Sequence, residues 1–493
     1  MFIISCAKII SVLLGIVGAL FIIPISVALY YGESDVLLSF IIPAAISIIA
    51  MFAINIPTRK IKISLKTKQT FLIVALSWIF ASLMCACTFY SSGYFSSFVD
   101  ALFESVSGIT TTGATILSDV ESLPRSINLL RCLTHWIGGM GIVTLTVALL
   151  PLLGIGGFQL IKAETTGPEK GKVTARITTT AKILWLIYFG LTVIETVALM
   201  IAGMDFVDAL SHAFATVGTG GFSTKNASIG SFNSAAIDII CTIFMFLCGI
   251  NFSLFYYLII KKFSDVYENS ELKAYFSIVV VFILIITFSL MPTYKSFGTS
   301  LRYSAFQVVS IITTTGFATA DYLFWPFISQ VFLFLLFFVG GCSGSTGGGI
   351  KVIRWVILGK QLNNETKQML HPHGVFTIQL NKRVCRKEIV FNVASFMTLY
   401  LVLVAITTVI GCIGNLDILT SFSAAASMVG NIGPAFGSLG PSNNCAMLPD
   451  FVKLWYSFAM LAGRLELYTM LIFFLLLYWE KYEFCFFIDI TVD

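Results

Sequence analysis

Ten long apolar runs restrict what this chain can fold into. They cover residues 9–30, 37–56, 71–93, 127–150, 183–203, 234–260, 275–291, 324–339, 389–413 and 451–479. An α-helix needs about 20 residues to cross the hydrocarbon core of a bilayer, so the pattern predicts ten membrane spans. Only 11% of the 493 residues are charged, against roughly 25% in soluble domains. We therefore expect an all-α polytopic membrane protein surrounded by membrane lipid.

The basic residues predict the topology. Most of the 30 Lys and Arg residues gather around 57–70, 162–182, 261–273 and 351–388, and the intervening loops hold acidic residues. Loops rich in Lys and Arg stay on the cytoplasmic side of a membrane. We therefore expect both termini in the cytoplasm.

The composition also argues against several classes of function. No basic patch carries interleaved aromatic residues, so nucleic-acid binding is not expected. The eleven cysteines include no Cys-x-x-Cys pair, which indicates neither a disulfide framework nor a zinc site. His371 and His373 flank a proline and make no convincing metal site. No Ser/His/Asp set or carboxylate pair suggests catalysis, so we do not expect an enzyme.

Four shorter apolar segments lie between successive pairs of spans, at 98–109, 206–217, 302–312 and 418–429. Runs of 10–14 residues are typical of re-entrant segments rather than spans. The first two begin with the same five residues, Phe-Val-Asp-Ala-Leu. Each segment leads directly into a loop rich in threonine or glycine. We name these loop 1, loop 2, loop 3 and loop 4, at residues 110–115, 218–223, 313–319 and 430–434.

Aligning the four loops superposes Gly113, Gly221, Gly316 and Gly433. Self-similarity at a regular interval indicates an internal repeat, here a span, a half-helix, a loop and a second span. The two N-terminal spans stand outside it. We expect an N-terminal unit followed by four repeats, with boundaries at 1–69, 70–160, 161–262, 263–360 and 361–493.

Physical chemistry favours a cation site at these loops. A non-helical loop at membrane depth must be buried or must line a watery path. Glycine permits positive φ angles, and rings of carbonyl oxygens replace the hydration shell of potassium. The C-terminal end of a half-helix adds partial negative charge. We therefore expect an ion-binding selectivity filter formed by Thr111, Thr112, Gly113, Thr219, Gly220, Gly221, Thr314, Thr315, Gly316, Asn431, Ile432 and Gly433.

Seven short stretches carry a family pattern: 135–142, 149–154, 220–224, 340–349, 371–372, 431–434 and 463–466. With them the chain resembles the membrane subunit of bacterial Trk potassium-uptake systems, in the superfamily that includes Ktr and plant HKT transporters. The resemblance covers nearly the whole chain. It implies potassium uptake, channel-like or coupled to an ion gradient, across the cytoplasmic membrane of a bacterium.

The resemblance also implies partners and a selectivity. It implies a homodimer with one pore per protomer, and a separate cytoplasmic ring of regulatory subunits that binds a nucleotide. The chain itself has no nucleotide motif, so K⁺ is its expected ligand, as the transported ion. In related proteins a serine at the first filter glycine accompanies sodium permeation, so Gly113 implies potassium. Loop 4 departs from the threonine pattern with Asn431 and Ile432.

A glycine-rich stretch at 340–349 interrupts the second span of repeat 3. A nucleotide-binding P-loop would need lysine where Ile350 stands, so ATP binding is not expected. The stretch is either a simple helix break or a mobile intramembrane loop beneath the filter, and the resemblance implies that it is the gate. The expected gate residues are Gly340, Gly341, Ser343, Gly344, Ser345, Thr346, Gly347, Gly348, Gly349 and Arg464.

Arg464 lies inside the last apolar run, where a central arginine costs about 2.5–3.5 kcal/mol on insertion scales. It either pairs with Glu466 or backbone carbonyls for structure, or faces the pore below the filter and opposes cation leak. For His135 we expect packing at the outer membrane interface, and for His212 a structural role.

Two other functions are compatible with parts of the sequence. A sodium or ammonium pathway would use the same fold. A polytopic membrane enzyme, such as a lipid head-group transferase, would leave the fourfold repeat unexplained. Coupling to protons is left open by the sequence.

Overall fold

The computed structural model describes residues 2–59, 61, 67–141, 177–381, 383–384 and 387–471. Within these residues six helical segments are long and apolar enough to cross a membrane. The first consists of two helices in line, and the expected all-α polytopic membrane fold is confirmed. These segments are α1 (Phe2–Leu20) with α2 (Ile22–Tyr31), α3 (Ser34–Asn55), α4 (Thr67–Ser91), α9 (Ile177–Ile201), α14 (Ser270–Tyr294) and α18 (Lys387–Ile413).

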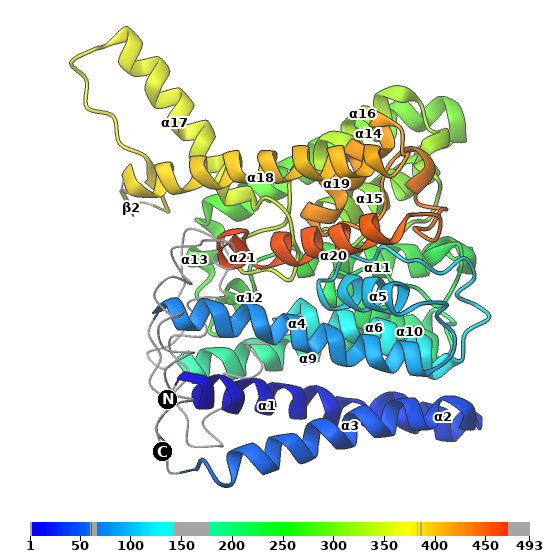
Figure 1. Cartoon of the computed structure of the whole chain (residues 1–493). Coiled ribbons are helices and arrows are strands. Elements are labelled where there is room, and N and C mark those ends of the chain that lie inside the picture. The colour runs from blue at the N-terminus through cyan, green and yellow to red at the C-terminus, as the bar shows by residue number, and fades with distance from the viewer. Residues whose placement is uncertain are drawn as a thin grey trace.

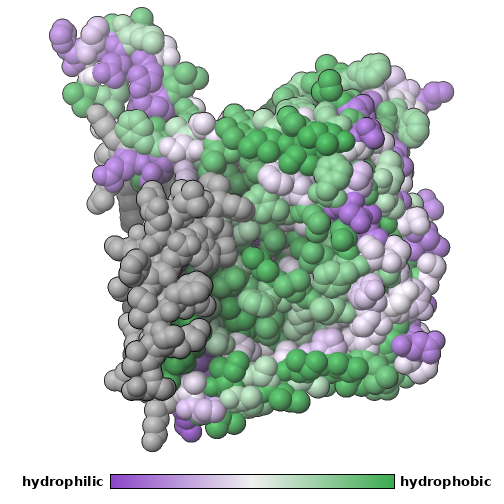
Figure 2. All heavy atoms as spheres, in the orientation of Figure 1, coloured by the Kyte–Doolittle hydropathy of each residue, from purple (hydrophilic) through white to green (hydrophobic). Residues whose placement is uncertain are grey.

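The long helices run across the view in Figure 1, so the membrane normal lies horizontally. The loops that join the half-helices to their second helices gather at the right edge. Helix α17 (Val352–Leu370) projects at the upper left. Figure 2 shows an apolar surface between polar residues at the right edge and at the α17 projection. This distribution fits a belt of lipid around the middle of the molecule.

Four copies of one unit follow the N-terminal helices. Each copy has a long helix, a half-helix that re-enters, a loop and a second helix. The long helices are α4, α9, α14 and α18. The half-helices are α5 (Phe98–Ile109), α10 (Phe206–Gly218), α15 (Phe297–Ile312) and α19 (Ile418–Gly430), and the second helices are α6 (Arg125–Gly139), α11 (Ala235–Cys248), α16 (Phe327–Leu336) and α20 (Asp450–Arg464).

The half-helices coincide with the predicted short segments, except that α15 begins five residues before the predicted start at 302. Arg302 therefore lies inside this helix, and its guanidinium Nε is 3.5 Å from the Asp238 carboxylate of α11. Two half-helices have side-chain caps. Ser97 Oγ accepts from the Asp100 amide at 3.1 Å, and Asp417 accepts from the Thr420 amide at 3.1 Å. Such caps satisfy amides that have no partner within the helix.

The second helices correct the prediction of continuous spans. The run at 234–260 is broken, because α11 and α12 (Phe252–Ile259) meet at an angle of 92°. Asn251 starts the new helix by accepting from the Ser253 amide at 2.9 Å. Helix α16 has only 10 residues, and α20 ends at Arg464, before α21 (Tyr468–Leu471). Parts of the predicted spans 127–150 and 451–479, and most of the basic loop 162–182, lie outside the described residues.

The remaining elements surround this fourfold core. Helices α1 and α3 pack on each other and on α4. On the side where α1 begins, α13 (Phe263–Tyr267) precedes α14, and a short antiparallel hairpin of β1 (Gln379–Leu380) and β2 (Arg383–Val384) precedes α18. Three 3-10 helices follow the loops on the opposite side: η2 (Ser228–Phe232), η3 (Tyr322–Phe324) and η4 (Gly437–Leu439).

Candidate cation-binding site

The four loops share one backbone conformation although their sequences differ. Each has two residues with positive φ, two positions apart, and the second is the aligned glycine. A non-glycine residue with positive φ is uncommon, so four matched pairs define one motif. The pairs are Thr111 (57°) and Gly113 (80°), Thr219 (55°) and Gly221 (83°), Thr314 (58°) and Gly316 (81°), and Asn431 (55°) and Gly433 (101°).

The four glycines lie against one another's loops in cyclic order. A Cβ atom built on Gly113 would lie less than 3.0 Å from the carbonyl oxygen of Gly220 in loop 2. Gly221 stands in the same relation to Thr315 O of loop 3, and Gly316 to Ile432 O of loop 4. Gly433 closes the cycle, because its Cβ would lie 2.5 Å from Thr112 O of loop 1. We call these glycines and carbonyls the glycine ring.

Hydrogen bonds between the segments that follow the loops close a second ring in the same order. Each repeat contacts the next at a distance of 2.8 to 3.1 Å. The bonds run from Val120 N to Asn226 Oδ1, from Gly230 N to Ala318 O, from Tyr322 OH to Ala435 O and from Cys445 N to Thr115 O. The fourfold arrangement therefore continues outward from the glycine ring.

A vestibule opens on this outer side. Its volume is about 150 Å³, and all four ring glycines line its floor. Segments from each repeat contribute to the wall, together with the residues around Lys225. The ring is therefore reached from the side opposite to α17.

Threonine hydroxyls brace loops 1 and 3 from behind. Thr110 Oγ1 lies 2.8 Å from Thr112 Oγ1 and donates to Val106 O at 2.7 Å, so Thr112 is the donor between the two hydroxyls. Thr313 and Thr315 repeat this pair at 2.8 Å. These hydroxyls are fully buried. The threonines therefore hold the carbonyls in place, and the backbone is left to face a ligand.

Asn431 explains why loop 4 departs from the threonine pattern. Its amide Nδ2 donates to Thr112 Oγ1 at 3.0 Å and to Met460 O of α20 at 2.9 Å. Asparagine also tolerates the left-handed backbone region. The side-chain nitrogen therefore links loop 4 to loop 1, while Asn431 Oδ1 is buried without a hydrogen-bond partner among the described residues.

His135 corrects the expectation of interfacial packing. Its side chain is fully buried, and Nδ1 donates to Gly108 O of α5 at 2.7 Å. Its Nε2 accepts from the Phe222 amide at 3.1 Å. The ring therefore joins the half-helix of repeat 1 to loop 2. His212 has the expected structural role, because its Nε2 lies 2.8 Å from Ser223 Oγ.

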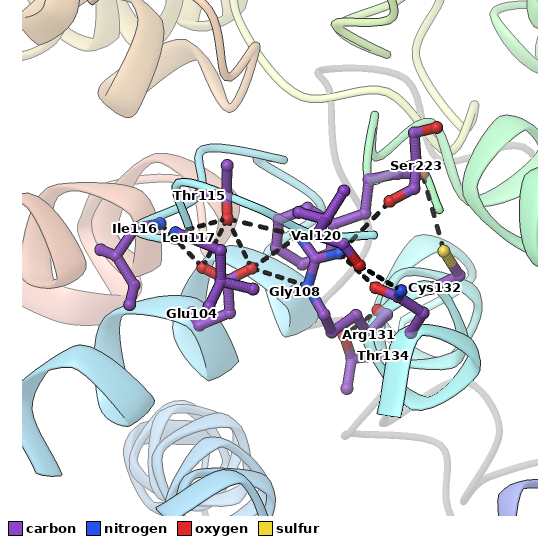
Figure 3. A network of polar contacts seen from close by, with 12 residues as sticks. Glu104, Gly108, Thr115, Ile116, Leu117, Val120, Arg131, Cys132, Thr134 and Ser223 are labelled. Carbon is purple, nitrogen blue, oxygen red and sulfur yellow. Dashed lines mark hydrogen bonds and ion pairs between the residues drawn. The ribbon is translucent and has the colours of Figure 1, made fainter. Parts of the chain in front are cut away.

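A buried ion pair behind loop 1 was missed by sequence reasoning. Glu104 of α5 and Arg131 of α6 lie 2.8 Å apart, and both side chains are at most 1% exposed (Figure 3). Glu104 also accepts from Thr115 Oγ1 at 2.9 Å, and Arg131 donates to Ser223 O at 3.2 Å. The pair therefore links loop 1 to loop 2. Its sequence signal is a glutamate inside an apolar half-helix.

The glycine-rich loop at 340–349 lies directly beneath the glycine ring. The Gly348 amide donates to Thr314 Oγ1 at 2.6 Å. A Cβ on Gly347 would lie 2.8 Å from Thr313 O, and one on Gly348 would lie 2.7 Å from Gly430 O. Both carbonyls belong to the inner ends of half-helices. The loop therefore closes against repeats 3 and 4 with no room for side chains.

Backbone contacts with the break in repeat 2 support this loop. The Cys342 amide donates to Gly249 O at 2.8 Å, and Gly344 O accepts from the Phe252 amide at 3.0 Å. Glu271, in the first turn of α14, accepts from the amides of Ser343 at 2.6 Å and Ile353 at 3.2 Å. One carboxylate oxygen thus joins a residue inside the glycine-rich loop to the start of α17, which follows it. Sequence reasoning did not identify Glu271.

Cationic side chains bind the carbonyls of the loop. Arg464 donates to Thr346 O at 2.8 Å, and also to Gly138 O at 2.8 Å and Gly139 O at 2.9 Å in repeat 1. Lys351, which is 2% exposed, donates to Gly347 O. Arg464 therefore bridges repeats 1 and 3.

Glu466, which the sequence suggested as a partner of Arg464, forms an ion pair with Arg354. The guanidinium of Arg354 also lies 3.6 Å from the centre of the Phe396 ring. Among the described residues, no group of three or more His, Cys, Asp or Glu side chains could hold a metal ion. Any cation at the ring would meet backbone carbonyls.

The fold and the ring define a polytopic membrane protein built around four re-entrant loops. Residues 38–482 match the TrkH family, described as "Cation transport protein". The match covers well over half of the sequence. The chain belongs to the TrkH family, whose members are transporters rather than enzymes.

Named relatives agree with this assignment. The chain is 42% identical to the "Trk system potassium uptake protein TrkH" of Escherichia coli (strain K12) over 434 residues, which cover 86% of this chain and 89% of that protein. It is 38% identical to the TrkH of Halomonas elongata over 479 residues, covering 96% and 98%. The crystal structure of the potassium transporter TrkH from Vibrio parahaemolyticus superposes with a TM-score of 0.86 at 35% identity, covering 97% of this chain and 100% of that chain.

Proposed function

We propose that this chain carries potassium into the cell through the glycine ring. The observation that carries the proposal is the closed cycle of four loops, in which each glycine lies against a carbonyl oxygen of the next. Carbonyl rings of this kind substitute for the hydration shell of a dehydrated cation. The names of the relatives in E. coli and H. elongata support potassium as the ion.

The filter in this proposal comprises each ring glycine and the two residues before it, which is the set expected from the sequence. Their backbone carbonyls are the ligands, and the threonine hydroxyls and the Asn431 amide hold them. The inner ends of α5, α10, α15 and α19 add the negative ends of four helix dipoles. These partial charges attract a cation without binding it so tightly that it cannot leave.

Uptake of rubidium, a potassium analogue, tests this function. The chain is expressed with its regulatory partner in cells that lack potassium uptake, and rubidium entry is measured against excess potassium, sodium or ammonium. Potassium should compete and sodium should not. Strong competition by sodium or ammonium would instead indicate one of the alternative pathways on the same fold, and no uptake in well-expressed protein would contradict the proposal.

In the same proposal the glycine-rich loop is the gate, and Arg464 holds it closed. The loop lies across the inner face of the ring, and the arginine places a positive charge at its edge. Loss of the guanidinium removes three hydrogen bonds and this charge. Arg464→Ala should therefore raise rubidium flux in the absence of the regulator. Unchanged flux at equal expression would exclude this role.

The proposal extends to assembly. The units at 1–69, 70–160, 161–262, 263–360 and 361–493 act as an N-terminal pair of helices and four repeats in the cytoplasmic membrane of a bacterium, with both termini inside. Two copies pair, and a nucleotide-binding regulatory ring binds on the cytoplasmic side. Exposed Leu362, Met369 and Leu370 on the projecting α17 suit such contacts. Mass measurement of the purified complex in detergent tests both partners.

A further inference from the structure

One buried acid has no part in the ring or the gate. Glu195 lies in α9, the long helix of repeat 2, and its side chain is fully buried. Neither carboxyl oxygen has a hydrogen-bond partner among the described residues. Its neighbours on the same helix face are satisfied, because Tyr188 donates to Trp136 O at 2.8 Å and Thr192 accepts from the Trp136 indole at 3.0 Å.

The half-helix behind loop 2 presents a hydroxyl to Glu195. Thr216 of α10 lies beside the carboxyl group, but its hydroxyl hydrogen is already donated to His212 O at 2.8 Å. Thr216 therefore offers only an oxygen lone pair. Facing that lone pair, an ionised carboxylate would be repelled, whereas a protonated carboxyl could donate to it.

No described cation offsets a charge at this position. On helix α11 the buried thiols of Cys241 and Cys248 lie within electrostatic range of Glu195. The acids on the neighbouring helices have partners elsewhere, because Asp208 of α10 accepts from Thr224 Oγ1 at 2.8 Å and Asp238 of α11 pairs with Arg302. Helix α12, which also packs on α9, carries only tyrosine hydroxyls as titratable groups.

Burying an isolated ionised carboxylate is so unfavourable that the group takes up a proton instead. Ionisable residues inside a membrane protein are also candidates for function by default. We propose that Glu195 binds a proton in the transporting protein and that potassium flux requires this bound proton. The inference rests on the proposed function, because it concerns flux through the same ring.

The link to the ring is short. Thr216 lies in the last turn of α10, three residues before Thr219, whose amide donates to Thr216 O at 2.9 Å. With the proton present, the carboxyl hydroxyl completes the bond to Thr216. Without it, a charge lies behind the half-helix, and water entry or displacement of α10 would disturb loop 2. Flux should therefore fall reversibly as the pH becomes alkaline.

Two measurements on the purified full-length protein test this inference. Infrared spectroscopy at neutral pH should detect a buried protonated carboxyl that disappears in Glu195→Gln. Rubidium flux into liposomes should decline at alkaline pH in the original protein, and Glu195→Gln, which stays neutral at any pH, should keep its flux. Glu388→Gln, the same change at an exposed site, should retain the alkaline decline.

The outcomes are distinct. A missing carboxyl band, or identical pH profiles for the original protein and Glu195→Gln, would overturn the proposal. If Glu195→Gln fails to fold, Thr216→Val removes the acceptor and should shift both the infrared band and the midpoint of the alkaline decline. An unshifted band and midpoint would count against it. If rubidium does not pass at all, the potassium function fails, while the infrared band still reports whether Glu195 carries a proton.

Discussion

The glycine ring and the layer beneath it are built from the same four repeats, yet they differ in symmetry. In the ring, every repeat contributes the same pair of positive φ angles and the same contact with its neighbour. In the layer beneath, repeat 2 bends by 92°, repeat 3 inserts the glycine-rich loop and repeat 4 contributes Arg464. In the proposed function, four similar loops surround a cation, whereas one loop and one charge cover its exit.

The two layers also differ in what holds them. The ring is packed backbone against backbone, so a single added methyl group has no space. The lower layer is held by backbone bonds and, in addition, by side chains, including those of Glu271, Lys351 and Arg464. Side-chain bonds can be exchanged one at a time, which suits the gate role proposed for this layer.

The largest effect is expected from breaking the ring itself. In Gly113→Ala the new Cβ would collide with the Gly220 carbonyl, and φ is +80°. Displacements of about 1 Å can cost about 100-fold in a positioned site, so we expect rubidium flux to fall by about that factor. Gly93→Ala is the matched control, with φ of +79° and nothing within 4 Å. It should keep flux and lose only about 1–2 kcal/mol from backbone strain.

If both alanine variants lost flux equally, backbone strain rather than contact between loops would be the cause. The positive φ angle alone would then explain why glycine is required at the ring positions.

The next largest effect is expected from breaking the buried ion pair that links loop 1 to loop 2. Arg131→Met leaves Glu104 buried without its ion partner, and removing one member of a buried pair costs about 3–5 kcal/mol. The purified variant should unfold at a markedly lower temperature in detergent. The double variant Glu104→Gln with Arg131→Met should recover part of the loss, because no unpaired charge remains. Equal stability of the single and double variants would contradict this account.

A smaller effect is expected in the lower layer. Lys351→Met removes the charged donor to Gly347 O, and bonds to charged groups contribute about 1.5–3 kcal/mol. Because 1.4 kcal/mol corresponds to a tenfold change in an equilibrium, resting rubidium flux should rise by about tenfold while selectivity is kept. Lys360→Met, which removes a half-buried lysine of α17 that donates to Gln379 O at 2.6 Å and not to the glycine-rich loop, is the control. A loss of selectivity for potassium over sodium would instead indicate that Lys351 acts on the glycine ring.

The smallest effect is expected at a half-helix cap. Asp417→Ala removes the acceptor for the Thr420 amide, at a typical cost of about 1 kcal/mol. Ser296→Ala, at a cap without a side-chain bond, should cost nothing measurable. Hydrogen bonds from Thr420 lower the pKa of Asp417. The cap therefore stabilises the folded state above the ordinary carboxyl range near 3.9, and this contribution is lost as pH falls through the lowered pKa.

A thermal unfolding series in acid checks this sign. The difference between Asp417→Ala and the original protein should shrink as the pH is lowered. A constant difference would assign the effect to helix propensity rather than to the charged cap.

The repeat and the aligned glycines were predictable because they follow from local pattern. Hydrophobic length separates a span from a half-helix, and Gly221 rather than Gly220 aligns with Gly113 in both sequence and φ. The partners of polar groups were not predictable. His135 was assigned to the interface because its partners, Gly108 and Phe222, are distant in sequence.

By itself the sequence determined the membrane class, the fourfold repeat and the place of the glycine-rich interruption, because apolar length and repeated spacing are properties of the chain alone. Only the tertiary structure decided that Glu104 pairs with Arg131, that Arg464 contacts Thr346 and that Glu195 has no hydrogen-bond partner within the described part of the chain. These facts depend on which helices meet at one depth. A buried charge is stabilised by groups that the fold brings close to it in space. The separation of these groups along the sequence does not predict that contact.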